Sequence, residues 1–153
     1  MKRIIYAIIG AAIIFAIFFA ITEVRRNSYE KMSTKVAERF LNQYVAMDTL
    51  ALSTYVAKEV DSTWDDDFYN IVTEYNKHSA TFSYKIEEVL IYQKPFDASF
   101  CAKAGVKADD LEYVSEIKVI VTATAYGEIY TKTAYVYVGR IDKEWKIVYQ
   151  SGL

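Results

Sequence analysis

The stretch that decides the fold is residues 112–150, in which three segments alternate between apolar and polar side chains. Residues 115–126 read Ser-Glu-Ile-Lys-Val-Ile-Val-Thr-Ala-Thr-Ala-Tyr, residues 129–138 form a second run, and residues 144–150 read Glu-Trp-Lys-Ile-Val-Tyr-Gln. A period of two with many β-branched residues is typical of strands. Because the connections between the runs are short, the sequence predicts three consecutive antiparallel strands.

The alternation also predicts which face of this sheet is buried. One face carries almost only apolar side chains, namely Ile117, Val119, Val121, Ala123, Ala134, Val136, Val138, Trp145, Ile147 and Tyr149. The other face is richer in Thr and Lys, but it also holds Ile120, Tyr135, Tyr137 and Val148. A sheet that is packed on one side and open on the other produces this pattern. We predict that Trp145 is buried together with Phe40 and Ile71.

The four apolar residues of the open face are the candidate interface. An apolar patch inside a polar rim often marks a contact surface, and Tyr is favoured there. The sequence therefore predicts Ile120, Tyr135, Tyr137 and Val148 as interface residues. The alternatives are that Tyr and Val simply suit exposed strands, or that the connection at residues 93–110 folds over this face.

Helices and one more strand are predicted upstream of residue 112. An apolar stripe at helical spacing comprises Val36, Ala37, Phe40, Leu41, Tyr44 and Val45. Two further helices are expected to bury Leu52, Tyr55, Val56, Phe68, Ile71, Val72 and Tyr75. Residues 81–92 alternate as a strand, and its predicted core face consists of Phe82, Tyr84, Ile86, Leu90 and Tyr92. The expected fold class is α+β, with helices packed on one face of a curved antiparallel sheet.

Caps and glycines predict where the elements end. A short helix at residues 98–104 would begin after Asp97 and stop at Gly105. Gly127 and Gly139 are expected to end the first and second strands of the meander. Residues 36–153 are accordingly predicted to form one domain.

The amino-terminal segment predicts a membrane anchor. No charged residue occurs from Ile4 to Ile21, and a run of this length meets the threshold for a transmembrane helix. We assign residues 1–3 to a basic head, residues 4–22 to a transmembrane signal anchor, and residues 23–35 to a juxtamembrane helix or linker. The partner of the anchor would be membrane lipid; a cleaved signal peptide and a buried helix are the alternatives.

Charges flanking this segment give two opposing signals for its orientation. Lys2 and Arg3 favour a cytoplasmic amino terminus. The basic residues past the other end favour the opposite orientation, namely Arg25, Arg26, Lys31 and Lys35. A tiny basic head before one apolar helix is the usual start of an exported, anchored domain. We therefore expect a single-pass protein with its amino terminus in the cytoplasm and its domain outside.

Bulk composition and single residues restrict the chemistry. The net charge of −2 argues against a nucleic-acid partner, and the one cysteine, Cys101, permits no intramolecular disulfide. Any histidine-dependent mechanism must use His78, whose place at a helix end is explained by the helix dipole. The acidic run at residues 65–67 suits a helix start better than a cation site. We predict no catalytic residue, no metal and no cofactor.

Three features together resemble the nuclear transport factor 2-like (cystatin-like cone) superfamily. They are the helical segment at residues 36–57, the order of helices, strand, connection and meander, and the ending Asp-Lys-Glu-Trp-Lys-Ile-Val at residues 142–148. With its anchor the chain is also loosely similar to the VirB-type inner-membrane scaffold of type IV secretion. This superfamily includes enzymes, binding proteins and scaffolds, so the fold does not determine the function.

The hypothesis from the sequence is a non-enzymatic, membrane-anchored interaction or assembly domain of the bacterial envelope. Such a domain would belong to a secretion, conjugation or surface complex and would bind a protein partner or itself. The alternatives are a small-ligand-binding cone domain and an anchored enzyme of isomerase or hydrolase type.

Overall fold

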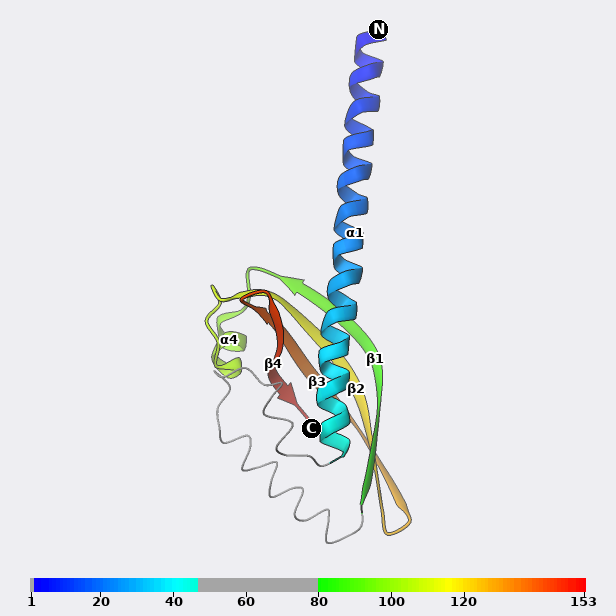
Figure 1. The fold of residues 1–153 in the computed structure, drawn as a ribbon, viewed down its shortest axis with the longest axis vertical. Helices are drawn as coiled ribbons and strands as arrows, with labels where there is room; N and C mark the ends of the chain where they lie inside the picture. Colours follow the sequence, from blue (N-terminus) through cyan, green and yellow to red (C-terminus); the bar gives the residue numbers. More distant parts are fainter. Residues whose placement is uncertain (1, 47–79) are drawn as a thin grey trace.

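The described residues fold into two helices and a four-stranded antiparallel sheet. The computed structural model describes residues 2–46 and 80–153, with the backbone alone for residues 2–10. The elements are α1 (Lys2–Val45), β1 (Thr81–Gln93), α4 (Ala98–Ala104), β2 (Leu111–Ala125), β3 (Glu128–Ile141) and β4 (Glu144–Ser151). The strands pair in the order β1-β2-β3-β4 (Figure 1), which confirms the α+β class and the meander. The two predicted helices around Leu52 and Phe68, the acidic run 65–67 and His78 lie outside the described residues.

One continuous helix of 44 residues, α1, covers one face of the sheet with its carboxy-terminal part. The predicted stripe is confirmed, because Ala37, Phe40, Leu41 and Tyr44 are at most 4% exposed. Contact with the sheet begins upstream of residue 36. The Tyr29 ring centroid lies 4.6 Å from that of Tyr113.

The amino-terminal part of α1 extends away from the sheet (Figure 1). Apolar side chains stand exposed along it: Ile13, Ile14, Phe15, Ile17, Phe18, Phe19, Ile21 and Val24. In the part of the chain that the structure describes, no helix reaches the combined length and apolarity of a membrane-crossing segment.

We call the face under α1 the inner face, and it forms the main core. Its buried residues on β2, β3 and β4 are Ile117, Val119, Val121, Ala134, Val136, Val138 and Ile147. All seven were predicted from the alternation. Two hydrogen bonds also join α1 to this face. The Ser33 and Ser115 hydroxyls are 2.9 Å apart, and the Tyr84 hydroxyl donates to Asn42 Oδ1 at 2.9 Å.

Trp145 is less buried than predicted. It lies on the inner face, but it is only half-buried and packs at the edge of the core. Its ring centroid is 5.8 Å from that of Tyr29. Across the strand pair from Trp145, Arg140 lies 5.0 Å from the Tyr29 ring and pairs with Glu112 at 2.8 Å. The tryptophan therefore belongs to a partly polar seam between α1 and the sheet.

Irregular pairing overturns the predicted face of three residues. The register of β1 shifts between Ile86 and Glu88, so Leu90 and Tyr92 lie opposite Glu116 and Val114 on the other face, which we call the outer face. The register of β4 shifts at Val148, which leaves Tyr149 opposite Tyr137. Leu90, Tyr92 and Tyr149 were predicted on the core face, and they lie on the outer face because each bulge adds one residue to the alternation.

Gly139 does not end a strand as predicted. Strand β3 continues through it to Ile141, and the turn is made by Asp142 and Lys143 with φ of 51° and 67°. A Cβ at Gly139 would lie 2.7 Å from both Leu111 Cδ2 and Val148 Cγ1. This glycine is thus required by close packing within the sheet, whereas Gly127 (φ 80°) does end β2, in a tight turn.

Candidate functional site

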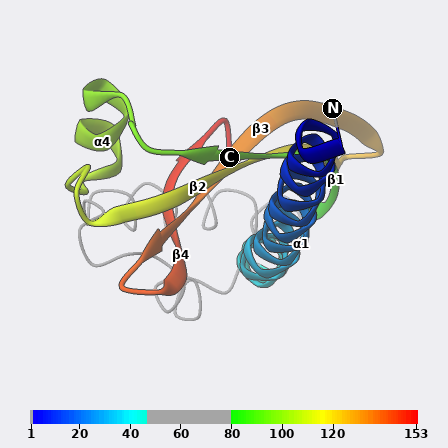
Figure 2. The same ribbon diagram turned by 90° about the horizontal axis from the view of Figure 1, so that it is seen from above.

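The connection between β1 and β2 covers one end of the outer face. Its helix α4 has the predicted bounds. Asp97 caps it by accepting from the backbone N–H of Ser99 and Phe100, and Gly105 ends it at φ 64°. Beneath it lies a second apolar cluster: Cys101, Ala104, Val106, Leu111, Val114, Ile141 and Val148. Seen from above, α4 and α1 lie toward different ends of the sheet (Figure 2).

This cover divides the four predicted interface residues into two pairs. Val148 is fully buried, so it offers no surface to a partner. Tyr137 is half-buried, and its ring centroid lies 5.4 Å from Phe100 and 5.5 Å from Tyr149. Ile120 and Tyr135 are half-buried farther along the outer face, opposite Thr133 and Lys118. An interface role for Ile120, Tyr135 and Tyr137 stays a prediction.

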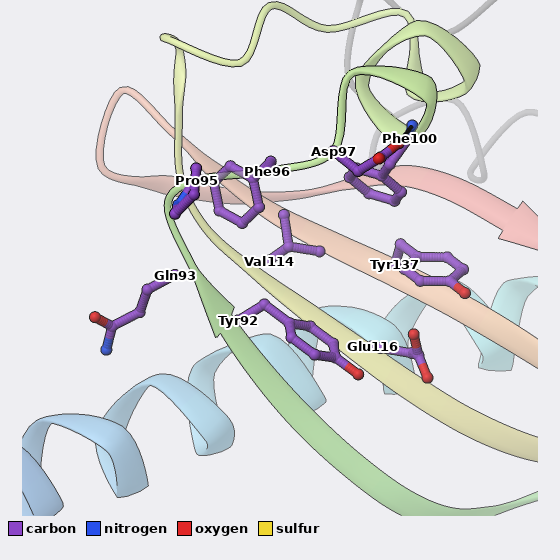
Figure 3. Close-up of a pocket in the computed structure, with 9 residues that line it drawn as sticks. All are labelled: Tyr92, Gln93, Pro95, Phe96, Asp97, Phe100, Val114, Glu116 and Tyr137. Atoms are coloured by element: carbon purple, nitrogen blue, oxygen red, sulfur yellow. Dashed lines mark hydrogen bonds between the residues drawn. The ribbon is translucent and has the colours of Figure 1, made fainter.

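A cavity of about 280 Å³ opens where the covered end of the outer face meets its open part. Figure 3 shows its lining, which is mostly aromatic and apolar. The lining residues are Tyr92, Gln93, Pro95, Phe96, Asp97, Phe100, Val114, Glu116 and Tyr137. We call it the outer-face cavity.

Strand register positions the polar end of the outer-face cavity. Glu116 pairs directly with Tyr137 across β2 and β3 and with Leu90 across β1 and β2. Tyr92 lies on the same face because of the bulge in β1. In Figure 3 the Glu116 carboxylate lies between the hydroxyl ends of Tyr92 and Tyr137, while Phe96 and Phe100 stand above from the connection.

The carboxylate alters the chemistry of both phenols. Burial, the nearby charge of Glu116 and a hydrogen bond with Glu116 raise the pKa of Tyr137 to about 12. Burial, Glu116 and Glu88 also raise the pKa of Tyr92. Both hydroxyls are therefore protonated at neutral pH, and Tyr137 donates to the carboxylate.

Basic side chains near the outer-face cavity are engaged elsewhere. The Lys118 ammonium lies 3.0 Å from Glu87, and Lys94 Nζ donates to the Asp109 carbonyl at 2.8 Å. Within residues 2–46 and 80–153, Glu116 makes no ion pair. Among the same residues no three His, Cys, Asp or Glu side chains converge to hold a metal.

Sequence reasoning missed Tyr92, Phe96, Phe100 and Glu116 as site residues. Two signals were available. The adjacent acids Glu87-Glu88 interrupt the alternation of β1, and the adjacent apolar pair Ile147-Val148 interrupts that of β4. The interruption in β1 coincides with the bulge that brings Tyr92 to the outer-face cavity, and the interruption in β4 coincides with the bulge that places Tyr149 beside Tyr137.

Comparison with known proteins gives matches for the structure only. No protein-family profile matches the sequence, and no curated protein sequence matches it. An NTF2-like protein of unknown function from Pseudomonas putida KT2440 matches with TM-score 0.56 and 8% identity over 81% of this chain and 84% of that one.

Two further solved structures match with lower TM-scores. Bd1075 of Bdellovibrio bacteriovorus matches with TM-score 0.50 and 10% identity over 77% of this chain, which spans 38% of that protein. A ketosteroid isomerase-like protein from Erwinia carotovora atroseptica matches with TM-score 0.49 and 11% identity over 81% of this chain and 94% of that one. The described elements and the Pseudomonas likeness together show that the chain has the nuclear transport factor 2-like fold.

Proposed function

We propose that this chain is a membrane-anchored binding domain of the bacterial envelope, in which α1 is the anchor and the outer face of the sheet is the binding surface. One observation carries the proposal. Consecutive residues of α1 such as Ile14 and Phe15 are 70% and 71% exposed, and Phe18 and Phe19 are 69% and 61% exposed. Residues 11–21 contain only Ala, Ile and Phe. Because successive helical residues point in directions about 100° apart, this part of α1 is apolar on all sides. Such a surface is stable when lipid or protein covers it.

The anchor and the domain are joined without a flexible link. The helix that carries the exposed residues continues into the stripe of Phe40 and Leu41, which are fully buried on the sheet. A partner bound to the sheet would thus be held at a fixed distance from the bilayer. This geometry suits an assembly subunit better than a freely diffusing binding protein.

Binding rather than catalysis is proposed from the chemistry of the outer-face cavity. Glu116 is the carboxylate available there, because Asp97 is engaged in capping α4. The phenol beside Glu116 stays protonated at neutral pH, since the pKa of Tyr137 is raised to about 12. General acid–base work needs a group that changes protonation near the working pH, and neither phenol does so.

The proposed orientation is an amino terminus in the cytoplasm and a domain outside. Lys2 and Arg3 support it, and Arg25 and Arg26, which lie at the other end of the apolar part, oppose it. Protease added to intact spheroplasts should digest the domain in this orientation. Protection of the domain until lysis would reverse the assignment.

The anchor is tested by alkaline carbonate extraction of membranes from cells that express the full-length chain. The wild type should stay in the membrane pellet. Changing Ile14→Lys with Phe18→Lys should release it, because each lysine at the centre of a span costs about 2.5–3.5 kcal/mol. The matched control is Met32→Lys, at an exposed apolar position (53%) on the part of α1 that packs on the sheet. Recovery of the wild type in the soluble fraction would refute the proposal.

A further inference from the structure

We propose that the outer-face cavity binds the cationic end of a Lys or Arg side chain presented by a protein partner. The inference rests on the proposed binding function and names the chemistry that the surface recognises. The cavity combines aromatic walls with a carboxylate that makes no ion pair with any described residue, and its size fits a side chain.

The first observation is that the Glu116 carboxylate has no ion-pair partner among residues 2–46 and 80–153. Glu116 is half-buried on the outer face and accepts a hydrogen bond from Tyr137. The nearest lysine along the strand, Lys118, is committed to Glu87 at 3.0 Å. Burying part of a carboxylate without a cation is unfavourable unless something else compensates. A cation that enters the cavity would supply the missing partner and form a charge-assisted hydrogen bond.

Aromatic side chains provide the second observation. Tyr92, Phe96, Phe100 and Tyr137 line the outer-face cavity, and its ionisable lining residues are the acids Asp97 and Glu116 and the two protonated phenols. A cation within about 6 Å of an aromatic face is attracted by the ring quadrupole. An anion would meet the same faces and the carboxylate with repulsion. The lining therefore selects for positive charge.

The size of the outer-face cavity and the surface around it indicate a side chain of a larger partner. Its volume of about 280 Å³ lies just below the roughly 300–1,000 Å³ of sites for drug-sized ligands. Leu90 and Tyr92 are 40% and 44% exposed beside its mouth. They can contact the apolar neighbours of a basic residue in a partner chain.

A second cavity of the molecule provides an internal contrast. It lies against Trp145 and is lined by Lys35, Arg39, Lys143 and Lys146, with Glu144 as its acid. Four basic groups would repel the same cation. Binding that depends on aromatic side chains alone would occur at both places, whereas the proposed binding occurs at the outer-face cavity only.

The test uses the full-length chain in non-ionic detergent, observed by NMR through the Val114 methyl groups on the cavity lining. The probes are acetyl-Leu-Lys-Leu-amide and its arginine counterpart, the neutral acetyl-Leu-norleucine-Leu-amide, and n-butylammonium. We expect saturable shifts with the two cationic peptides, and affinities at least about tenfold weaker for the neutral peptide and for n-butylammonium. Equal binding of the neutral peptide would overturn the charge selectivity, and equal binding of n-butylammonium would overturn the assignment to a protein side chain.

Variants locate the binding within the molecule. Glu116→Gln keeps the shape of the side chain and should weaken the lysine peptide about tenfold or more. Glu88→Gln removes one charge from the same face outside the cavity lining and should change affinity less than about twofold. Tyr92→Leu, at an exposed position, should weaken binding without affecting the fold. Unchanged binding in both Glu116→Gln and Tyr92→Leu would refute the inference. Because Glu116→Gln leaves α1 intact, carbonate extraction of this variant reports separately on the anchor.

Discussion

Both faces of the sheet carry apolar side chains but use them differently. On the inner face α1 and the neighbouring side chains cover Ile117, Val119 and Val136 completely, and each of the three is 0% exposed. On the outer face α4 buries Val148 completely, whereas Tyr137 and Tyr92 stay partly exposed around the cavity. The inner face therefore stabilises the fold, and the outer face leaves apolar surface and the Glu116 carboxylate partly exposed.

The largest expected difference between the faces concerns stability. Phe40→Ala removes a fully buried ring from the inner core and should cost about 3–5 kcal/mol of unfolding free energy. Phe100→Ala removes a half-exposed ring beside the outer-face cavity and should cost less than about half of that. Urea unfolding of the detergent-solubilised chain, followed by far-UV circular dichroism, measures both. Equal losses of unfolding free energy in the two variants would mean that packing on the outer face stabilises the fold as much as packing on the inner face.

The next effect concerns the glycine under the covered end of the outer face. Gly139→Ala places a Cβ 2.7 Å from Leu111 Cδ2 and Val148 Cγ1 and should cost about 1–3 kcal/mol through overpacking. Val148→Ala in the Gly139→Ala background should recover part of this loss, because it removes one of the two clashing groups. The same unfolding experiment gives the coupling energy between the two sites.

A second glycine serves as the control for this explanation. Gly127 has φ 80° and open space around it, so Gly127→Ala is strained by its backbone conformation alone, at about 1–2 kcal/mol. Gly127→Asn should be tolerated better, since Asn adopts positive φ. If Val148→Ala rescued Gly127→Ala as well, packing would not be what distinguishes Gly139.

Alternation along the strands was sufficient to predict the inner face. The side chains of Ile117, Val119 and Val136 follow strict period-two positions within segments that contain no bulge. The stripe of Phe40 and Leu41 follows helical spacing in the same way. These residues are identified by local patterns, and local patterns are visible in one sequence.

The candidate site could not be predicted by the same reasoning. Tyr92 reaches the outer face only because β1 gains a residue near Glu87, and Tyr149 reaches it because β4 gains Val148. A bulge reverses every face assignment beyond it, and its position depends on the partner strand. The role of Glu116 further requires that Lys118 pairs with Glu87, which is a contact between two strands.

A smaller effect tests the electrostatics of the outer face. The folded-state pKa of Tyr137 is raised from 10.0 to about 12, so folding favours the protonated phenol. The corresponding stability is fully present below pH 10 and is lost as the pH rises from about 10 to about 12. Titration of the Tyr137 ring carbon by NMR should give a midpoint near 12. Glu116→Gln should lower this midpoint toward 10, and Glu88→Gln should leave it nearly unchanged; equal shifts in both variants would show a general effect of surface charge.

The smallest expected effect on stability comes from deleting Glu87, the residue that shifts the alternation of β1. Glu87 is the extra residue of the β1 bulge, so its deletion should restore regular pairing while Ile86 and Val89 stay on the inner face and Leu90 and Tyr92 on the outer. The loss should be below about 1 kcal/mol, mainly from the partly exposed ion pair with Lys118. Deleting Lys85 instead is the matched control, because the alternation would then move Ile86 outward and bring the Glu87 carboxylate toward the core at a cost of several kcal/mol. Urea unfolding measures the loss of unfolding free energy in both deletion variants. Similar losses in the two variants, or a larger loss on deleting Glu87, would mean that the bulge is not what places Tyr92 beside Glu116.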